Sequence, residues 1–464
     1  MRITKHLLLL ESAILLCSIT LLSGCNFVRI DIPDEIVGTE TVFKDDSIAI
    51  AAIRGIYSTM TEPGHFACGD QYSITYLAGV SSDELFWSDT FDPSTESFAN
   101  NELLPSNAVA HKLWTSCYKT IYYANTVLEG IAASTGISTG TREQLEGEAR
   151  FVRAFSYFYL VNLFGKVPLV LTTDYRISEA LHRAEVNTVY TQLRDDLIVA
   201  AGLLKNYPNG RRTRPNALAA HALLARVYLY QREWARAEKQ ASLVINSGTY
   251  TLVNDVRSVF LANSHEAIWQ LKPTLIALGI NTWEAQIFSG NPVLNPTVMS
   301  WFEANDKRIA WTATVPGETV QGYAPNKYVV TYTPPGNEPE EYATVLRYAE
   351  QFLIRAEARV WLQNAPGAAA DIDVIRARAG LPLFSVADPL PDDATLLAAV
   401  YQERRVEFLA EWAHRWFDLK RTGRVDAVMQ AEIGDAWKAT DALYPIPQTE
   451  ITNDPNLAPQ NDGY

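Results

Sequence analysis

VYQERRVEFLAEWAHRWFDLKRTGR, at Val400–Arg424, is the stretch from which the fold can be predicted. Written as one continuous helix, it spaces apolar side chains three and four residues apart along a single stripe. These apolar positions are Val406, Leu409, Ala410, Ala413 and Phe417. The charged positions that fall largely around the rest are Glu403, Arg404, Glu407, Glu411, Arg415 and Asp418. We therefore predict a helix that packs on one side and carries an ion-pair lattice on the other.

The carboxylates of this stretch stand in like-charge pairs. Glu403 and Glu407, and then Glu407 and Glu411, are four residues apart, which is repulsive unless cations lie between them. The arginines placed to supply that charge are Arg404, Arg405 and Arg415. Stacked carboxylates can also indicate acid–base catalysis, but no set of a histidine with a nucleophile accompanies them. The pattern favours a structural role.

The same stretch resembles the C-terminal helix of the RagB/SusD-like family of nutrient-binding outer-membrane lipoproteins. The chain then ends LYPIPQTEITNDPNLAPQNDGY, which is similar to the family's closing segment but has Asp462 where the family usually has proline. Helical segments near 108–131, 142–164 and 347–362 also resemble the family. The resemblance covers nearly the whole mature chain and implies a single SusD-like domain over residues 42–464.

The composition limits the class of partner. The chain has 464 residues, 48% of them hydrophobic, which is enough for a sizeable core. Its formal charge is −14, and it contains no run of lysine or arginine. Such a chain is a poor candidate for binding nucleic acid or for electrostatic docking to anionic lipid.

The N-terminus has the pattern of an exported lipoprotein. Basic residues Arg2 and Lys5 precede an apolar run that ends Leu-Leu-Ser-Gly-Cys at Cys25. This ending resembles a bacterial lipobox. We expect residues 1–24 to be a signal peptide that is removed, Cys25 to be lipidated (palmitate included), and residues 25–41 to form a tether. Acyl chains would then anchor the protein to the outer membrane without any transmembrane helix.

Motifs for catalysis are absent from the sequence. There is no phosphate-binding loop, dinucleotide fingerprint, zinc-protease motif or nucleophile elbow. We therefore predict a protein that is not an enzyme and that has no cofactor and no metal site. Cys68 and Cys117 lack the spacing of a zinc site, and they form either a disulfide or two buried thiols.

The helical periods predict the frame of the domain. A helix is expected over 42–60, an irregular loop over 61–107, and further helices up to residue 248. Two segments then share a spacing of small and large residues at an offset of 133, typical of tetratricopeptide hairpins. The first contains Ala225, Tyr228, Ala237, Ala241 and Val244, and the second Ala358, Trp361, Ala370, Val374 and Ala377.

An irregular excursion over 249–344 separates the two repeats. It holds strand-like pieces such as EAIWQLKP (266–273) and NKYVVTYTPP (326–335). The C-terminal helical part and closing tail occupy 345–464. The fold class expected is mainly α, a tetratricopeptide-like scaffold of helical hairpins with a packed, loop-rich portion that contains short strands.

The resemblance implies a surface lipoprotein that captures a glycan and delivers it to a SusC-like TonB-dependent transporter. Sugars bind aromatic platforms, and polar side chains reach their hydroxyl groups. By analogy with the family, the candidate binding residues are Trp87, Asn100, Asn101, Trp283, Trp311 and Tyr323. Two alternatives stay open: peptide capture of the RagB type, and a tetratricopeptide scaffold in a surface complex without a small ligand.

Overall fold

The computed structural model describes residues 42–87, 92–205, 211–274, 279–291, 293–316 and 322–464. The helices and strands named below all belong to one unit, Phe43–Tyr464. The expected signal peptide (1–24), the lipidation site Cys25 and the tether (25–41) lie outside the described residues.

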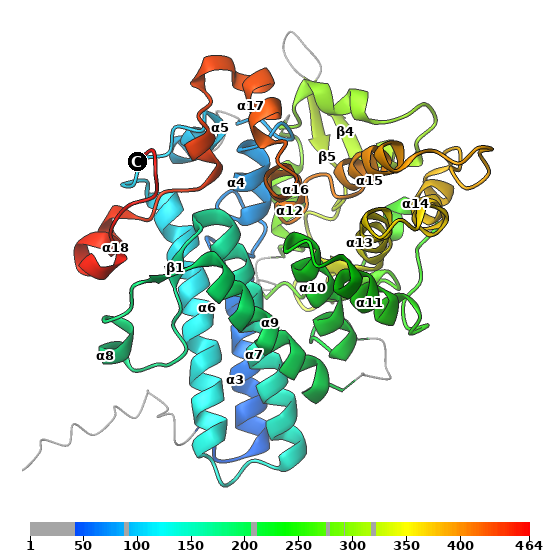
Figure 1. Ribbon diagram of the computed structural model, residues 1–464. Helices are drawn as coiled ribbons and strands as arrows, with labels where there is room; N and C mark the ends of the chain where they lie inside the picture. The colour runs from blue at the N-terminus through cyan, green and yellow to red at the C-terminus, as the bar shows by residue number, and fades with distance from the viewer. Residues whose placement is uncertain (1–41, 88–91, 206–210, 275–278, 292, 317–321) are drawn as a thin grey trace, which may run out of the picture. The chain divides into compact units, whose positions relative to one another are not determined.

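Long helices form the N-terminal half: α3 (Asp46–Met60), α6 (Ala108–Ala133), α7 (Thr139–Phe164) and α9 (Val186–Leu203). Helix α7 lies against α6 and α9, and α3 packs on α6 and α7 (Figure 1). Side-chain caps mark the starts of α3, α6 and α7; at α3 the carboxylate of Asp45 accepts the backbone N–H groups of Ser47 and Ile48. The helices predicted over 42–60, 108–131 and 142–164 are confirmed, with their ends shifted.

Two helical hairpins form the tetratricopeptide-like scaffold. Helices α10 (Ala217–Tyr230) and α11 (Trp234–Ile245) make the first, and α13 (Tyr348–Trp361) and α14 (Ala365–Ala379) the second. Helix α11 packs on α13, so the second hairpin continues the first in space (Figure 1). The mainly α, hairpin-based fold class is confirmed.

The predicted repeat offset of 133 residues is wrong in register. The turns of the two hairpins correspond at Arg232 and Gln363, the positive-φ residues that follow α10 and α13, and these are 131 residues apart. In the predicted second unit, Ala370, Ala377 and Trp361 are exposed and Val374 is only half-buried. The true counterparts of the first unit are fully buried at Ala356, Ala368, Ile372 and Ile375. An apolar pattern in alanine-rich helices matches at several offsets, and only the hairpin turn distinguishes them.

Short antiparallel strand pairs occur in the irregular portion. Strand β3 (Ala267–Leu271) pairs with β6 (Ala343–Arg347), and β4 (Thr312–Val315) pairs with β5 (Gly322–Pro325). A third pair joins β1 (Val167–Pro168) to β2 (Arg183–Ala184). The strand expected within 266–273 is confirmed as β3. The described part of 326–335 has no ladder strand; there the carboxylate of Glu341 accepts backbone N–H groups instead.

The single helix predicted over Val400–Arg424 is wrong. Helix α15 (Asp393–Glu407) ends at Glu407, and α16 (His414–Arg421) starts after a turn. That turn contains left-handed residues at Ala410, Trp412 and Ala413, with φ of 52°, 47° and 63°. The turn contains no glycine or proline from which it could have been predicted. The indole Nε1 of Trp412 donates to the Thr344 carbonyl (2.8 Å), so contacts with β6 hold a turn that local propensity does not favour.

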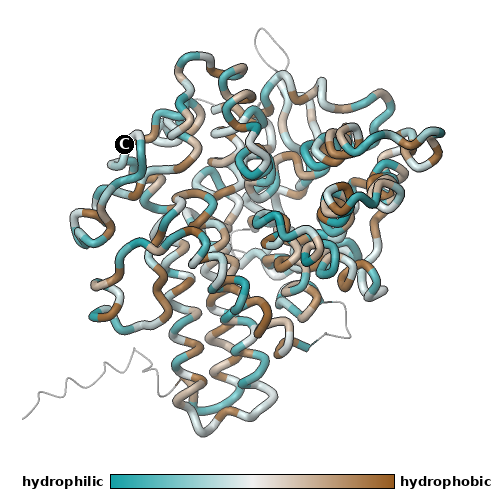
Figure 2. The backbone as a smooth tube through the Cα atoms, viewed as in Figure 1, coloured by the Kyte–Doolittle hydropathy of each residue, from teal (hydrophilic) through white to brown (hydrophobic). Residues whose placement is uncertain are grey.

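Shorter elements complete the unit. The α-helices among them are α4 (Ile74–Val80), α5 (Glu96–Ala99), α8 (Tyr175–Ser178), α12 (Trp283–Phe288), α17 (Val425–Ile433) and α18 (Gln448–Asn453). The 3-10 helices include η1 (Pro93–Thr95), η2 (Val256–Ser258), η4 (Pro296–Trp301), η5 (Lys307–Trp311), η6 (Gly434–Ala436), η7 (Ala439–Ala442) and η8 (Pro455–Leu457). Hydrophobic and hydrophilic residues alternate along the helices, as expected when one face of each lies in the core (Figure 2).

The closing segment folds back onto the N-terminal half. The side-chain amide of Asn461 donates to the carbonyls of Phe164 and Tyr444 (2.9 and 2.8 Å). The hydroxyl of buried Tyr444 is 2.9 Å from that of Ser81. This part of the sequence motif therefore joins the C-terminal tail to α7 and to the loop after α4.

Candidate functional site

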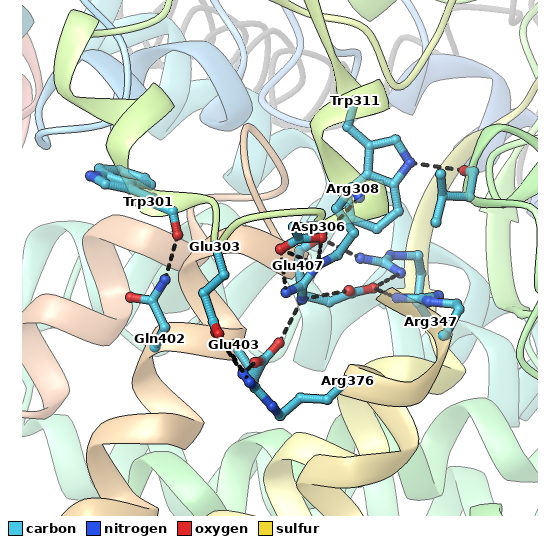
Figure 3. Close-up of polar contacts among 12 residues, drawn as sticks. Trp301, Glu303, Asp306, Arg308, Trp311, Arg347, Arg376, Gln402, Glu403 and Glu407 are labelled. Atoms are coloured by element: carbon cyan, nitrogen blue, oxygen red, sulfur yellow. Dashed lines mark hydrogen bonds and ion pairs between the residues drawn. The ribbon is translucent and has the colours of Figure 1, made fainter. Parts of the chain in front are cut away.

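The carboxylates of α15 form a buried ion-pair network rather than a surface lattice. Glu403 and Glu407 are fully buried. Arg308 and Arg376 each reach Glu403 at 2.7 Å, and Arg347 reaches Glu407 at 2.8 Å (Figure 3). The predicted ion-pair lattice is present, but the expectation that it lies away from the packed side of the helix is wrong, since these charges lie between α15 and its neighbouring elements.

The cations that neutralise these carboxylates come from distant parts of the chain. Arg404 instead bonds Asp418 (2.7 Å), and Arg415 bonds Asp83 (2.6 Å). The expectation that neighbouring arginines supply the charge is thus wrong, because the α15 carboxylates face η5, β6 and α14. The partners that do supply it are Arg308, Lys327, Arg347, Arg376 and Arg378.

The network has the electrostatics of a structural frame. Burial by itself raises the pKa of Glu407, but Arg378, Arg347 and Arg308 together hold that pKa below its ordinary value. A carboxylate held ionised by several arginines is well suited to fixing the positions of α14, α15 and β6. The network thereby joins α15 to η5 and β6, which belong to the irregular portion of the fold.

Two of the predicted binding residues are brought to one edge of the irregular portion. The Phe86 N–H donates to the Val293 carbonyl, and the Leu294 N–H donates to the Tyr323 carbonyl, both at 2.9 Å. The segment at Val293 and Leu294 therefore lies between the segment leading to Trp87 and strand β5. We call Phe86, Trp87 and Tyr323 the aromatic edge.

The side chains of the aromatic edge are partly accessible. Trp87 and Tyr323 are half-buried, and Phe86 is exposed. Among the described residues, the indole Nε1 of Trp87 has no hydrogen-bond partner. Partly exposed rings held by backbone hydrogen bonds can offer a rigid face to an apolar surface of a ligand.

The remaining predicted site residues lie elsewhere. Trp311 is 0% exposed in a cluster with Val259 and Phe260, and its Nε1 donates to the Val256 carbonyl (2.8 Å). The expectation of an accessible Trp311 ring is therefore wrong, because this tryptophan fills the core under η5. Trp283 is half-buried beside a cavity of about 20 Å³ on α12.

The two asparagines differ in their surroundings. Asn101 is buried in the left-handed conformation (φ 52°), and its amide donates to the Ser81 carbonyl at 3.4 Å. Asn100 is exposed at the end of α5. The structure thus places Trp87 and Tyr323 on either side of the segment at Val293 and Leu294, keeps Asn101 for an internal contact, and leaves Asn100 accessible.

Sequence reasoning missed an aromatic pair on the hairpin scaffold. The rings of Trp234 and Trp361 stack with centroids 5.3 Å apart and planes 8° apart, although Trp361 is 51% exposed. They line a hollow of about 400 Å³ together with Tyr401 and Arg421. The pair was not predicted because the wrong repeat offset assigned Trp361 to the large position of the second repeat unit, where it would pack between helices.

Other classes of site are not seen in the part of the chain that the structure describes. No group of three or more His, Cys, Asp or Glu side chains there could hold a metal ion. No helix among the described residues is both long and apolar enough to cross a membrane. Cys68 and Cys117 are buried free thiols, and burial raises the pKa of each.

Comparison with known proteins agrees with this architecture. Residues 67–229 match the family described as "Starch-binding associating with outer membrane", and residues 305–464 match the SusD family. SusD-like protein P2 of Formosa agariphila is 25% identical over 96% of this chain and 97% of its own length.

Solved structures show the same fold. A SusD superfamily protein from Bacteroides vulgatus superposes with a TM-score of 0.77 at 20% identity, covering 91% of this chain and all of that one. A laminarin-binding SusD-like protein superposes at 0.73 with 25% identity, again over 91% of this chain and all of the other. The chain belongs to the SusD/RagB-like family.

Proposed function

We propose that this protein captures oligosaccharides at the cell surface and passes them to a SusC-like TonB-dependent transporter in the outer membrane. The observation that carries the proposal is the aromatic edge, placed on the fold of this family. Sugar rings present apolar C–H faces that stack on aromatic side chains. A similar protein is a laminarin-binding SusD-like protein, and the family matched by residues 67–229 is described as starch-binding.

The proposed capture is binding without chemistry. A binding protein needs an accessible surface and a few oriented polar groups, but no activated nucleophile. The α15 carboxylates are buried and paired with arginines, which suits a frame that holds a binding surface in place. Trp87 and Tyr323 would stack on the sugar, with exposed Asn100 as an additional polar contact.

The location forms part of the same proposal. Lipidation of Cys25 would keep the protein at the outer membrane, facing the exterior, without a membrane-spanning helix. Replacing Cys25 by alanine should then release the protein from the membrane fraction. If the Cys25→Ala protein still sedimented with membranes, the anchor would have to be sought elsewhere.

Direct titration tests the binding surface. The protein from Asn26 onward, which contains the whole unit Phe43–Tyr464, would be titrated calorimetrically with oligosaccharides and peptides. Trp87→Ala and Tyr323→Ala should each weaken glycan binding by about tenfold, as loss of a stacking contact does. Tyr175→Ala, at a ring 72% exposed on α8, is the matched control and should leave binding unchanged.

Each outcome of the titration assigns the function. Glycan binding that depends on Trp87 or Tyr323 supports the proposal. Binding of peptides alone would favour the RagB-type alternative. Glycan binding that neither substitution weakens would show that the ligand lies elsewhere on the fold.

A further inference from the structure

Although the chain is acidic overall, one of its pockets is lined by four basic side chains. A pocket of about 610 Å³ opens between α3, the segment before α10 and the segment after β3. Its size is typical of a small-molecule site. Its lining includes Arg54, Arg211, Arg214 and Lys272, and no Asp or Glu is among the lining residues that the structure describes. We call these four residues and the space between them the basic pocket.

One wall of the basic pocket is built on a buried carboxylate. Glu148 of α7 is fully buried and accepts from the Arg214 Nε (3.0 Å) and from the Tyr57 hydroxyl (2.6 Å). The amide of Gln144 also donates to Glu148 (2.6 Å). These bonds hold the Arg214 guanidinium in the wall, where 20% of its side chain stays exposed.

The other cations of the pocket, Arg54, Arg211 and Lys272, have no buried carboxylate as a partner among the described residues. Arg54 and Arg211 are exposed, and neither forms a salt bridge with another described residue. Arg54 shares its face of α3 with Tyr57 and Ser58, which are three and four residues further on. Lys272 bonds the exposed Glu338, whose side chain is 75% accessible and free to be displaced.

Local backbone geometry separates the two neighbouring arginines. Arg212 is buried with its guanidinium 4.5 Å from the ring of Tyr250, whereas Arg211 and Arg214 line the pocket. The sequence RRTR at 211–214 is thus divided between the core and the hollow. Two of these three arginines, Arg211 and Arg214, therefore place their positive charge in the basic pocket.

The basic pocket adjoins polar and aromatic groups suited to a sugar. Ser58, Thr213 and Thr274 contribute hydroxyls to its lining. Thr274 also lines the adjacent small cavity beside Trp283, and its hydroxyl is 2.8 Å from that of Thr61. Thr274 therefore lines both the basic pocket and the small cavity beside Trp283.

We propose that the basic pocket binds the acidic groups of an oligosaccharide that carries carboxylates or sulfates. This inference rests on the proposed function and specifies its ligand class. Guanidinium groups bind carboxylate and sulfate through paired charge-assisted hydrogen bonds, and a neutral sugar has no group that needs the guanidinium groups of Arg54 and Arg211, which are unpaired among the described residues. The formal charge of −14 makes a long nucleic acid a poor occupant, since the rest of the surface repels it.

The test compares acidic oligosaccharides with neutral versions of the same chains. Uronate oligosaccharides would be paired with their methyl esters, and sulfated oligosaccharides with their desulfated forms. The protein from Asn26 onward would be titrated with each pair, as wild type and as Arg54→Gln/Arg211→Gln. These two arginines are exposed and make no salt bridge among the described residues, so the double variant should fold normally. Arg257→Gln, an exposed arginine outside the pocket, is the control.

The expected result is preference for the charged member of a pair. The double variant should bind the acidic oligosaccharide about tenfold to a hundredfold more weakly, because two charge-assisted contacts are lost. Arg257→Gln should bind like the wild type. Raising the salt concentration should also weaken binding of the acidic oligosaccharide more than that of its neutral partner.

Contrary results separate this inference from the proposed function. Binding of neutral oligosaccharides with no gain from added charge would overturn the basic pocket assignment and leave glycan capture intact. Acidic binding that survives Arg54→Gln/Arg211→Gln would place the charged groups elsewhere and also overturn it. Binding of acidic peptides or inorganic sulfate alone would overturn the oligosaccharide assignment. Failure of every oligosaccharide to bind would refute the proposed function itself.

Discussion

Replacing Glu407 by glutamine should destabilise the protein by about 3–5 kcal/mol, the range found when one partner of a buried ion pair is removed. The carboxylate is fully buried and bonds Arg347 (2.8 Å) and Arg378, with Arg308 at 3.4 Å. Glutamine has nearly the same shape, so little packing is lost. What changes is the charge, so that Arg308, Arg347 and Arg378 lose the one carboxylate that all three share, although each keeps another carboxylate partner.

The pH dependence follows from the depressed pKa of Glu407. A carboxylate with a lower pKa in the folded than in the unfolded state stabilises the protein above the unfolded pKa, about 4.3. That stabilisation is lost as the pH falls through the folded pKa. The difference in unfolding free energy between wild type and Glu407→Gln should therefore be largest at neutral pH and should shrink in acid.

Urea unfolding followed by tryptophan fluorescence measures this difference. Glu102→Gln, at an exposed glutamate, is the control and should change the free energy of unfolding by less than about 0.5 kcal/mol. A Glu407→Gln protein within about 1 kcal/mol of the wild type at neutral pH would show that the stability of the buried network does not depend on this charge.

Further predictions concern four other buried side chains. Burial raises the pKa of Glu284 to about 8, so the free energy of unfolding should fall as the pH rises from about 4.5 to about 8. The Glu284→Gln protein should therefore be about 3 kcal/mol more stable than the wild type at pH 7 and equal to it near pH 4. Equal stability of the two proteins at both pH values would contradict this expectation. Trp311→Ala should lower the free energy of unfolding by about 3–5 kcal/mol without changing the ligand affinity of the folded fraction, whereas an affinity loss at full stability would return Trp311 to the binding site. Cys68 and Cys117 should react with iodoacetamide only after denaturation, and rapid labelling of the native protein would show that they are not buried thiols.

The hairpin scaffold could be predicted from sequence, but its register could not. Small residues such as Ala225 and Ala237 are buried as expected, because helices that cross closely need small side chains. The turn residues Arg232 and Gln363, which define the true repeat, carry no glycine signal. Their left-handed conformation is set by the packing of the helices around them, which periodicity does not reveal.

For the buried ion-pair network, the need for cations could be predicted from sequence, but the arginines that supply them could not. The spacing of Glu403, Glu407 and Glu411 correctly indicates that these carboxylates need cations. Arg308 and Arg347 meet them from η5 and the end of β6, far away in sequence. Only the tertiary arrangement decides which arginines are near, and it also buries a face that the helical pattern places in solvent.

The candidate site could be predicted in part. The irregular segments were expected to hold aromatic residues with access to a ligand; Trp87 and Tyr323 are partly accessible on segments that flank Val293 and Leu294, and their role in binding stays a prediction. Composition does not distinguish a core tryptophan such as Trp311 from an accessible one, since both lie in loop-rich sequence. The basic pocket draws on α3, 211–214 and 272–274, so no single stretch of sequence indicates it.

The most direct test of the account is calorimetric titration of the protein from Asn26 onward with a panel of neutral and acidic oligosaccharides. Saturable binding to at least one of them is expected, weakened about tenfold by Trp87→Ala or Tyr323→Ala and unaffected by Tyr175→Ala. No binding to any oligosaccharide, by the protein alone or together with its co-purified transporter, would contradict the claim that this chain captures glycans.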